Sequence, residues 1–355
     1  MPSADMFVPI ENLALSAPIQ VGRVAFHPST KVQELGARLE ALIARADAPP
    51  DWKEWRKEVT LGNIERFAEG RVIASVRCDV AGDKNLLRRF QSGEVSPSLG
   101  TIKQALSVLH LLKLEVAGRF DTRYQVFGLS GDLTRAAHYI VAVDQQRRGV
   151  REYRYRHGAL ASWEFTEEAL NRARASPLYD FFHAALLKGR EACELQKRLL
   201  NAAWWVYEAA LEFGWHVRCV KLLTALEAAF VPDGQRKSFG LAKMSAMLLC
   251  DCVKQDQGYC PIPDAQDYSE YQNLLHQHKS RVGCSLFDDM RDWYALRSEV
   301  VHEGFHGVAE GWVLPLEWRS HEMLDQTVRV AREDGLATLE DLWRRVEERH
   351  RAKKL

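Results

Sequence analysis

The chain has 355 residues, with 48 lysine and arginine residues against 48 aspartate and glutamate residues. Because a single hydrophobic core stops growing at about 250–300 residues, this length favours two domains. The balanced charge excludes an overall electrostatic attraction to nucleic acid, so any such binding has to be local. The seven cysteines are irregularly spaced and odd in number, which argues against a disulfide framework.

The first twenty residues, MPSADMFVPIENLALSAPIQ, contain no basic segment followed by an apolar run. No later segment approaches the roughly 20 consecutive apolar residues that a membrane span requires. We therefore expect a cytoplasmic protein that does not enter a membrane.

The first part of the chain mixes strand-like and helical patterns. Period-two alternation and β-branched content predict strands, whereas apolar residues at three- and four-residue spacing predict helices. The predicted strands are 19–26, 71–80, 138–143 and 149–157, and the predicted helices are 30–45 and 99–114. We expect an α+β domain over residues 1–160, with no repeat, no phosphate-binding glycine loop and no catalytic signature of its own.

From residue 161 onwards the pattern is almost entirely helical. Thr166 followed by two glutamates is typical of a helix start, and Pro177 restarts the chain. The predicted helices are 166–174, 186–213, 219–230, 239–253, the segment from 285, and one amphipathic helix after Trp318. Helices joined by short connections predict an all-α bundle over residues 161–355.

The segment Ser285 to Gly307 carries the most informative pattern. Its apolar residues recur at helical spacing, and Gly304 marks a helix stop. Arg297 and His302 are five residues apart, which is about 140° around a straight helix. We expect the two to converge only if the last turn loosens and the long arginine reaches past it.

Arg297 and His302 suit the cleavage of RNA without a metal. A histidine near neutral pKa can take a proton from a ribose hydroxyl or return one to the leaving oxygen. An arginine fork can hold the phosphate and stabilise the charge that develops on it. The alternative is structural: the arginine pairs with Glu299 or Glu303, and the histidine caps its own helix end.

Two further residues are candidates for supporting roles. Ser298 follows the arginine and either contacts a phosphate or is simply exposed. Glu227 lies in an apolar helical segment, where a buried carboxylate needs a partner. It either orients Arg297 across the bundle or is an exposed helix residue.

The order of these segments resembles a known family. Arg297 and His302, followed by Glu303 and Gly304, resemble the Arg-x(four to six)-His motif of HEPN domains, the "higher eukaryotes and prokaryotes nucleotide-binding" family. The segment Cys219–Phe230, with its Leu-Glu-Ala sequence, is similar to the "ALE" helix of the Apea-like HEPN subgroup. The segment 241–249 resembles the helix that follows the "ALE" helix in that subgroup. The resemblance covers about residues 190–345.

The resemblance implies a HEPN-type helical bundle with metal-independent endoribonuclease activity. It also implies homodimers in which two Arg–His pairs meet in one cleft, and roles in antiphage defence or toxin systems. We expect single-stranded or looped RNA as the substrate and no cofactor. The competing hypothesis is a non-catalytic HEPN module that binds a nucleotide or RNA end, or that acts as a scaffold for a partner.

Two other clusters contain residue types that bind metals or nucleic acid. The cysteines and histidines at 250, 252, 260, 276, 278 and 284 lack the Cys-x-x-Cys knuckle of zinc fingers, so we predict no metal site. The basic segment 147–157, if it is a strand, places Arg151, Tyr153 and Tyr155 on one face, which suits contacts with bases and phosphates. Its alternative is an edge strand protected by charge.

Overall fold

The computed structural model describes residues 3–29, isolated positions between 37 and 55, and the ranges 72–79, 97–117, 125–129, 137–144, 149–156, 163–212, 214–232, 237–249, 262–277 and 284–352. The chain splits into two compact units. One comprises Met1–Leu109 and Val116–Ala175, and the other His110–Glu115 and Ser176–Leu355. Along the chain, the long continuous part of the second unit begins at Ser176, whereas the sequence analysis expected a boundary at residue 160.

The first unit contains a four-stranded antiparallel sheet. Its strands, in spatial order, are β1 (Ser3–Ile10), β5 (Val72–Asp79), β4 (Val24–His27) and β3 (Ile19–Val21). The predicted strand over 71–80 is confirmed as β5. The single strand predicted over 19–26 is instead the hairpin β3–β4, because Gly22 adopts a left-handed φ of 59° at the turn.

Two smaller strand pairs belong to the same unit. β2 (Leu13–Leu15) pairs in parallel with β8 (Trp163–Phe165), and β6 (Ala137–Asp144) pairs antiparallel with β7 (Gly149–Arg156). The strands predicted over 138–143 and 149–157 are therefore confirmed. The helix predicted over 30–45 lies largely outside the described residues.

Two helices of the first unit have described bounds. α4 (Pro97–Ala117) matches the helix predicted over 99–114, and its segment 110–115 belongs to the second unit. α6 (Glu167–Ala175) begins after Thr166, whose hydroxyl oxygen accepts a hydrogen bond from the Ala169 amide at 3.2 Å. That cap is the one the sequence predicted.

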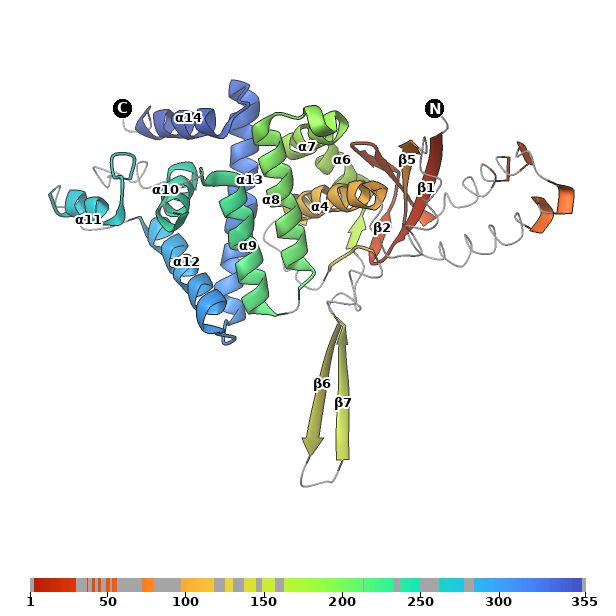
Figure 1. Ribbon diagram of the computed structural model, residues 1–355, viewed down its shortest axis with the longest axis horizontal. Helices are drawn as coiled ribbons and strands as arrows, with labels where there is room; N and C mark the ends of the chain where they lie inside the picture. Colours follow the sequence, from red (N-terminus) through yellow and green to blue (C-terminus); the bar gives the residue numbers. More distant parts are fainter. Residues whose placement is uncertain are drawn as a thin grey trace. The chain divides into compact units, whose positions relative to one another are not determined.

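The second unit is helical (Figure 1). Its described elements are α7 (Pro177–Lys188), the 3₁₀ turn η3 (Gly189–Glu191), α8 (Glu194–Ala210), α9 (Trp215–Phe230), α10 (Lys237–Leu249), α11 (Tyr268–Gln277), α12 (Ser285–Glu303), α13 (Glu310–Asp334) and α14 (Leu339–Ala352). α9 lies among them and contacts α8, α10, α12 and α13. Its inward side chains, including Leu222, Leu223 and Leu226, are fully buried. The chain therefore has an α+β layout, with a small N-terminal strand region and a C-terminal helical region.

Two predicted helices are in fact divided by glycines. The helix predicted over 186–213 is broken at Gly189, whose φ of 56° ends α7 before α8 begins. The amphipathic helix predicted after Trp318 is α13 and α14, divided at Gly335 with a φ of 65°. A left-handed residue cannot continue an α-helix, and glycine adopts that conformation without steric cost.

A polar cluster lies inside the helical unit, between the 110–115 segment, α9 and α13. Arg218 is 1% exposed, and its Nη2 donates to Glu317 Oε2 at 2.8 Å. Burial lowers the pKa of nearby Lys113 to about 7, with Glu317 opposing this shift and Arg218 adding to it. Such a charge cluster stabilises the fold only while its carboxylate is present.

Within the described residues, no helix is both long enough and apolar enough to cross a membrane.

Candidate functional site

The helix that carries the motif forms as its sequence predicts. α12 buries Leu286, Phe287, Met290 and Trp293 on one face. It ends at Gly304, which adopts a left-handed φ of 68° and whose amide donates to the Glu299 carbonyl. The predicted helix and its glycine stop are both confirmed.

α12 runs antiparallel to α9. Arg297 lies beside Glu227, near the end of α9. The ring of His306, just past the end of α12, lies against His216 in the first turn of α9, with ring centroids 4.7 Å apart. The last turns of α12 therefore lie against α9, the helix that carries the Leu-Glu-Ala sequence.

Glu227 holds Arg297 in place. Arg297 Nη2 lies 3.4 Å from Glu227 Oε1, and the two side chains are 20% and 10% exposed. Among the described residues, Arg297 makes no ion pair with Glu299 or Glu303. The sequence left open whether Glu227 is exposed or faces Arg297, and the structure places it against Arg297.

Two residues that the sequence did not single out share this carboxylate. Lys237, at the start of α10, donates from Nζ to Glu227 Oε2 at 2.9 Å, and this hydrogen bond raises the pKa of Lys237. Tyr294 lies one turn before Arg297, whose guanidinium is 5.4 Å from the centroid of the tyrosine ring. Burial, followed by the Glu227 charge, raises the pKa of Tyr294. The Glu227 carboxylate therefore interacts with two cations, Arg297 and Lys237, and with the phenol of Tyr294.

His302 occupies a different environment. It is exposed in the last turn of α12, and in the described part of the chain no hydrogen bond or ion pair joins it to Arg297. α12 stays helical through Glu303, so the loosened last turn expected from the sequence is absent. The offset of about 140° between the two residues is therefore retained within one chain.

The surface around His302 combines histidines with exposed apolar side chains. Burial, and then the neighbouring His306, lowers the pKa of His216. Val301 and Phe305, on either side of His302 in the sequence, are 50% and 42% exposed. Ser298 is only partly exposed and directly follows Arg297.

The remaining candidates are described only in part. Arg151, Tyr153 and Tyr155 pair across the β6–β7 ladder with Ala142, Ile140 and His138, and their side chains lie outside the description. Of the cysteine and histidine cluster, only His276 and Cys284 lie in described ranges. Within those ranges no group of three or more His, Cys, Asp or Glu side chains forms a metal-binding set.

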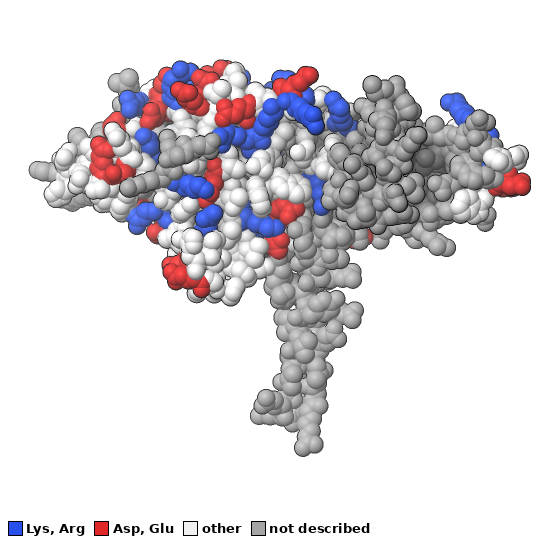
Figure 2. All heavy atoms as spheres, viewed as in Figure 1, with Lys and Arg blue, Asp and Glu red and all other residues white. Residues whose placement is uncertain are grey.

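Charge is interspersed on the visible face of the helical unit, where Lys and Arg alternate with Asp and Glu (Figure 2). The charges of Glu227, Arg297 and Lys237 therefore form a local group in a chain of balanced composition.

A comparison with protein-family models, with curated proteins and with solved structures gives no match. The assignment of a function therefore has to come from the residues of this site.

Proposed function

We propose that this chain is a metal-independent endoribonuclease of the HEPN type, in which Arg297 and His302 carry the chemistry. The observation that carries the proposal is the fixed guanidinium of Arg297 on the motif helix. Glu227 pairs with one side of it through Nη2, and 20% of the side chain remains exposed. A held arginine with donor capacity to spare is suited to bind a phosphate.

In the proposed reaction, His302 removes the proton from a ribose 2′-hydroxyl, and the 2′-oxygen attacks the adjacent phosphorus. The bond to the 5′-oxygen breaks, and that oxygen takes a proton from a histidine. The products are a 2′,3′-cyclic phosphate and a 5′-hydroxyl. Arg297 stabilises the negative charge on the non-bridging oxygens, and Lys237, 56% exposed beside it, adds a second positive charge.

The proposed active form is a homodimer through α12. Arg297 and His302 do not meet within one chain, so a complete site requires the histidine of a second copy opposite the arginine. Val301 and Phe305 flank His302 and expose apolar surface that such a copy would cover. Light scattering that gives a monomer at micromolar concentration, with cleavage retained, would contradict this arrangement.

The proposed substrate is single-stranded or looped RNA, because an unstacked nucleotide can turn its hydroxyl in line with the phosphate. The basic aromatic strand β7, with Arg151, Tyr153 and Tyr155, is the proposed RNA contact in the first unit. Antiphage defence or a toxin system in the cytoplasm is the biological setting that the family resemblance implies.

The decisive test is cleavage of an RNA panel by wild type, His302→Ala and Arg297→Ala. We expect His302→Ala to lose about 10²–10⁴-fold in rate, the usual contribution of general acid–base assistance. Arg297→Ala should lose about 10²–10³-fold, the usual contribution of one donor that stabilises developing negative charge. Wild-type cleavage should survive EDTA, and the products should carry a cyclic phosphate. His276→Ala is the matched control, because His276 is also exposed in the last turn of a helix. Cleavage unchanged in both motif variants would refute the proposal.

The second candidate function is a non-catalytic RNA- or nucleotide-binding module or scaffold. It is favoured by the fact that Arg297 already has an intrachain ion pair and does not contact His302. RNA binding without cleavage, weakened by Arg297→Ala and unaffected by His302→Ala, would select this function.

A further inference from the structure

A pocket of about 940 Å³ opens in the helical unit between the start of α8, the first halves of α10 and α14, and the loop before α11. Its lining includes none of Arg297, His302, Ser298 or Glu227, so it is distinct from the proposed ribonuclease site. Its volume lies at the upper end of the range of small-molecule sites.

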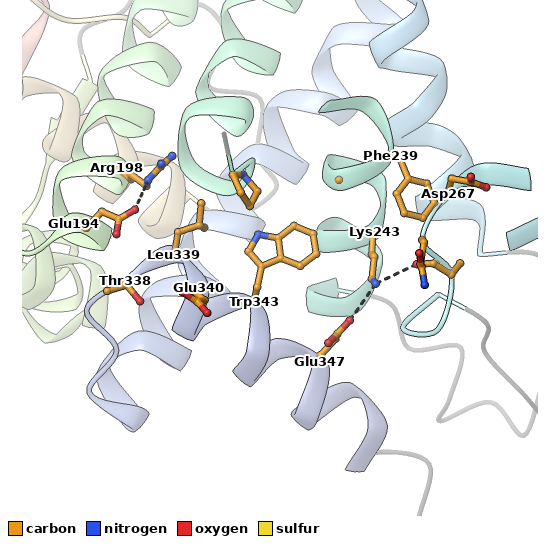
Figure 3. A pocket seen from close by; sticks show the side chains of 14 residues that line it. Glu194, Arg198, Phe239, Lys243, Asp267, Thr338, Leu339, Glu340, Trp343 and Glu347 are labelled. Atoms are coloured by element: carbon orange, nitrogen blue, oxygen red, sulfur yellow. Dashed lines mark hydrogen bonds and ion pairs between the residues drawn. The ribbon is translucent and has the colours of Figure 1, made fainter. Parts of the chain in front are cut away.

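The indole of Trp343 lies in the middle of this pocket (Figure 3). Its Nε1 donates to the Phe230 carbonyl at 2.8 Å, which fixes the orientation of the ring. On α14, Glu340 precedes Trp343 by three residues and Glu347 follows it by four, so the three share one face of the helix. Figure 3 accordingly shows the two glutamates on opposite sides of the indole. Seven residues of helix rise about 10 Å, so an acidic group stands at each end of an aromatic surface.

The side of the pocket that holds Glu340 has an excess of one negative charge. The start of α8 is fixed beside the start of α14 by a hydrogen bond from the Leu195 amide to the Ala337 carbonyl at 2.9 Å. There Arg198 Nε donates to Glu194 at 2.9 Å. Glu340 is exposed and makes no hydrogen bond or ion pair among the described residues. This side of the lining thus has two carboxylates and one cation.

The opposite side, with Glu347, has the same excess. Lys243 Nζ lies 3.0 Å from Glu347 and also donates to two carbonyls of the loop before α11, at 3.0 and 3.2 Å. An ammonium group has three donors, so Lys243 has none left for a ligand. Asp267, at the end of that loop, accepts the Glu270 amide at 2.9 Å through one oxygen and has no cation beside it in the described ranges. Here too the lining has two carboxylates and one cation.

We infer that this pocket binds a linear aliphatic polyamine, which lies across Trp343 with one terminal ammonium group on each side of the indole. Each end meets one uncompensated negative charge, and the methylene chain and any middle ammonium group pack on the ring. A ligand with one cation satisfies only one side of the pocket. A peptide with two lysines has the same charges, but its backbone amides would lose water there without gaining a partner. Phosphate esters are repelled by the carboxylates on both sides.

The test is calorimetric titration of the full chain with spermidine, octamethylenediamine, trimethylenediamine and octylamine. We expect octamethylenediamine to bind about fivefold tighter than octylamine, the most that a second, partly exposed ion pair contributes. Spermidine should bind about threefold tighter again, because its middle ammonium group lies over the indole. Trimethylenediamine should bind no tighter than octylamine, because it cannot reach both sides.

Three results would overturn the inference. Equal binding of octylamine and octamethylenediamine would show that the second cation has no partner. Equal binding of the short and the long diamine would show that charge alone, and not the span across Trp343, sets the affinity. Tighter binding of acetyl-Lys-Gly-Lys-amide than of spermidine would assign the pocket to a polypeptide.

Variants make the assignment specific to this pocket. Glu340→Gln and Asp267→Asn each remove one uncompensated charge, and an asparagine still accepts the Glu270 amide. In each variant the advantage of octamethylenediamine over octylamine should disappear, whereas a purely structural change would weaken both ligands alike. Glu167→Gln, which changes an exposed first-turn glutamate of α6, is the control and should keep the wild-type ratio. Wild-type ratios in Glu340→Gln and Asp267→Asn, or the same loss in Glu167→Gln, would refute the site.

The role of the indole is tested separately. Trp343→Leu should remove the advantage of spermidine over octamethylenediamine, because leucine fills space but has no π-system. If Trp343→Leu does not fold, Trp343→Phe keeps a ring and should retain most of that advantage. A wild-type ratio in Trp343→Leu, or its complete loss in Trp343→Phe, would contradict the proposed position of the ligand.

Discussion

Glu227 contacts two cations in different environments, and this difference gives a quantitative prediction. Arg297 is 20% exposed and Lys237 is 56% exposed, while the shared carboxylate is 10% exposed. Arg297→Met and Lys237→Met each remove one of the two contacts, and Glu227→Gln weakens both; each substitution keeps most of the side chain. Combining Glu227→Gln with Arg297→Met, and separately with Lys237→Met, completes two double-mutant cycles that share Glu227→Gln.

The expected coupling energies follow from burial. Breaking a fully buried ion pair costs about 3–5 kcal/mol, and an exposed pair contributes about 0.2–1 kcal/mol. The Arg297 pair is mostly buried but 3.4 Å long, so we expect a coupling of about 1–2 kcal/mol. The Lys237 pair is shorter, at 2.9 Å, yet water screens it, so we expect less than about 0.5 kcal/mol. Burial, and not distance, should decide the order.

The assay is urea denaturation followed by circular dichroism at a helical wavelength, with melting temperatures as a second measure. For a unit of this size, each kcal/mol corresponds to roughly 2–4 °C. Equal coupling energies for the two cations, or a larger one for Lys237, would refute the reasoning. In an active protein, Glu227→Gln should also lower kcat more than it raises KM, because a positioning residue acts on the arginine and not on free substrate.

Two further predictions concern the interior and the end of the motif helix. Burial holds the pKa of Lys113 at about 7 in the folded chain, below its ordinary value. At a pH between the folded and the ordinary pKa, Lys113 carries a proton in the unfolded chain but has lost it in the folded chain. The Lys113 contribution therefore makes stability rise as pH increases above about 7, and Lys113→Met should flatten that rise in urea titrations from pH 6 to 9. Gly304→Ala should cost about 1–2 kcal/mol, because its φ of 68° strains any side chain although the space around it is open. Gly304→Asn should cost less, and equal melting temperatures for wild type and Gly304→Ala would contradict this.

The elements that the sequence predicted correctly are those fixed by local chemistry. The Thr166 cap and the left-handed Gly304 each satisfy a helix end through atoms a few residues away. The strand β5 and the ladder of β6 with β7 follow from β-branched content and a polar turn. Such features need no knowledge of the rest of the fold.

The elements that it missed depend on longer-range contacts or on continuous apolar patterns. β1 pairs with β5, with Ser3 opposite Asp79, and nothing within Ser3–Ile10 itself reveals that partner. Gly189 and Gly335 were overlooked because apolar spacing continues on both sides of each break. Periodicity alone does not register a single left-handed residue.

The residues of the candidate site also differ in whether the sequence predicts them. Arg297 and His302 are visible in the sequence because their spacing forms a motif, and Glu227 because a carboxylate in an apolar segment requires a partner. Lys237 gave no such signal: it contacts Glu227 because the start of α10 lies beside the end of α9 in the folded chain. Its position results from tertiary packing, which no local pattern encodes.

The presence of Lys237 bears on whether an arginine held by a carboxylate can serve catalysis. A phosphate that approaches Arg297 competes with Glu227, and releasing a mostly buried carboxylate without a partner would be costly. Lys237 already binds the other oxygen of that carboxylate, so Glu227 keeps a cation when Arg297 turns to the phosphate. The ion pair between Arg297 and Glu227 is therefore compatible with both proposed functions. In the catalytic one, Lys237→Met should weaken RNA cleavage without a matching loss of stability, since its own ion pair is exposed.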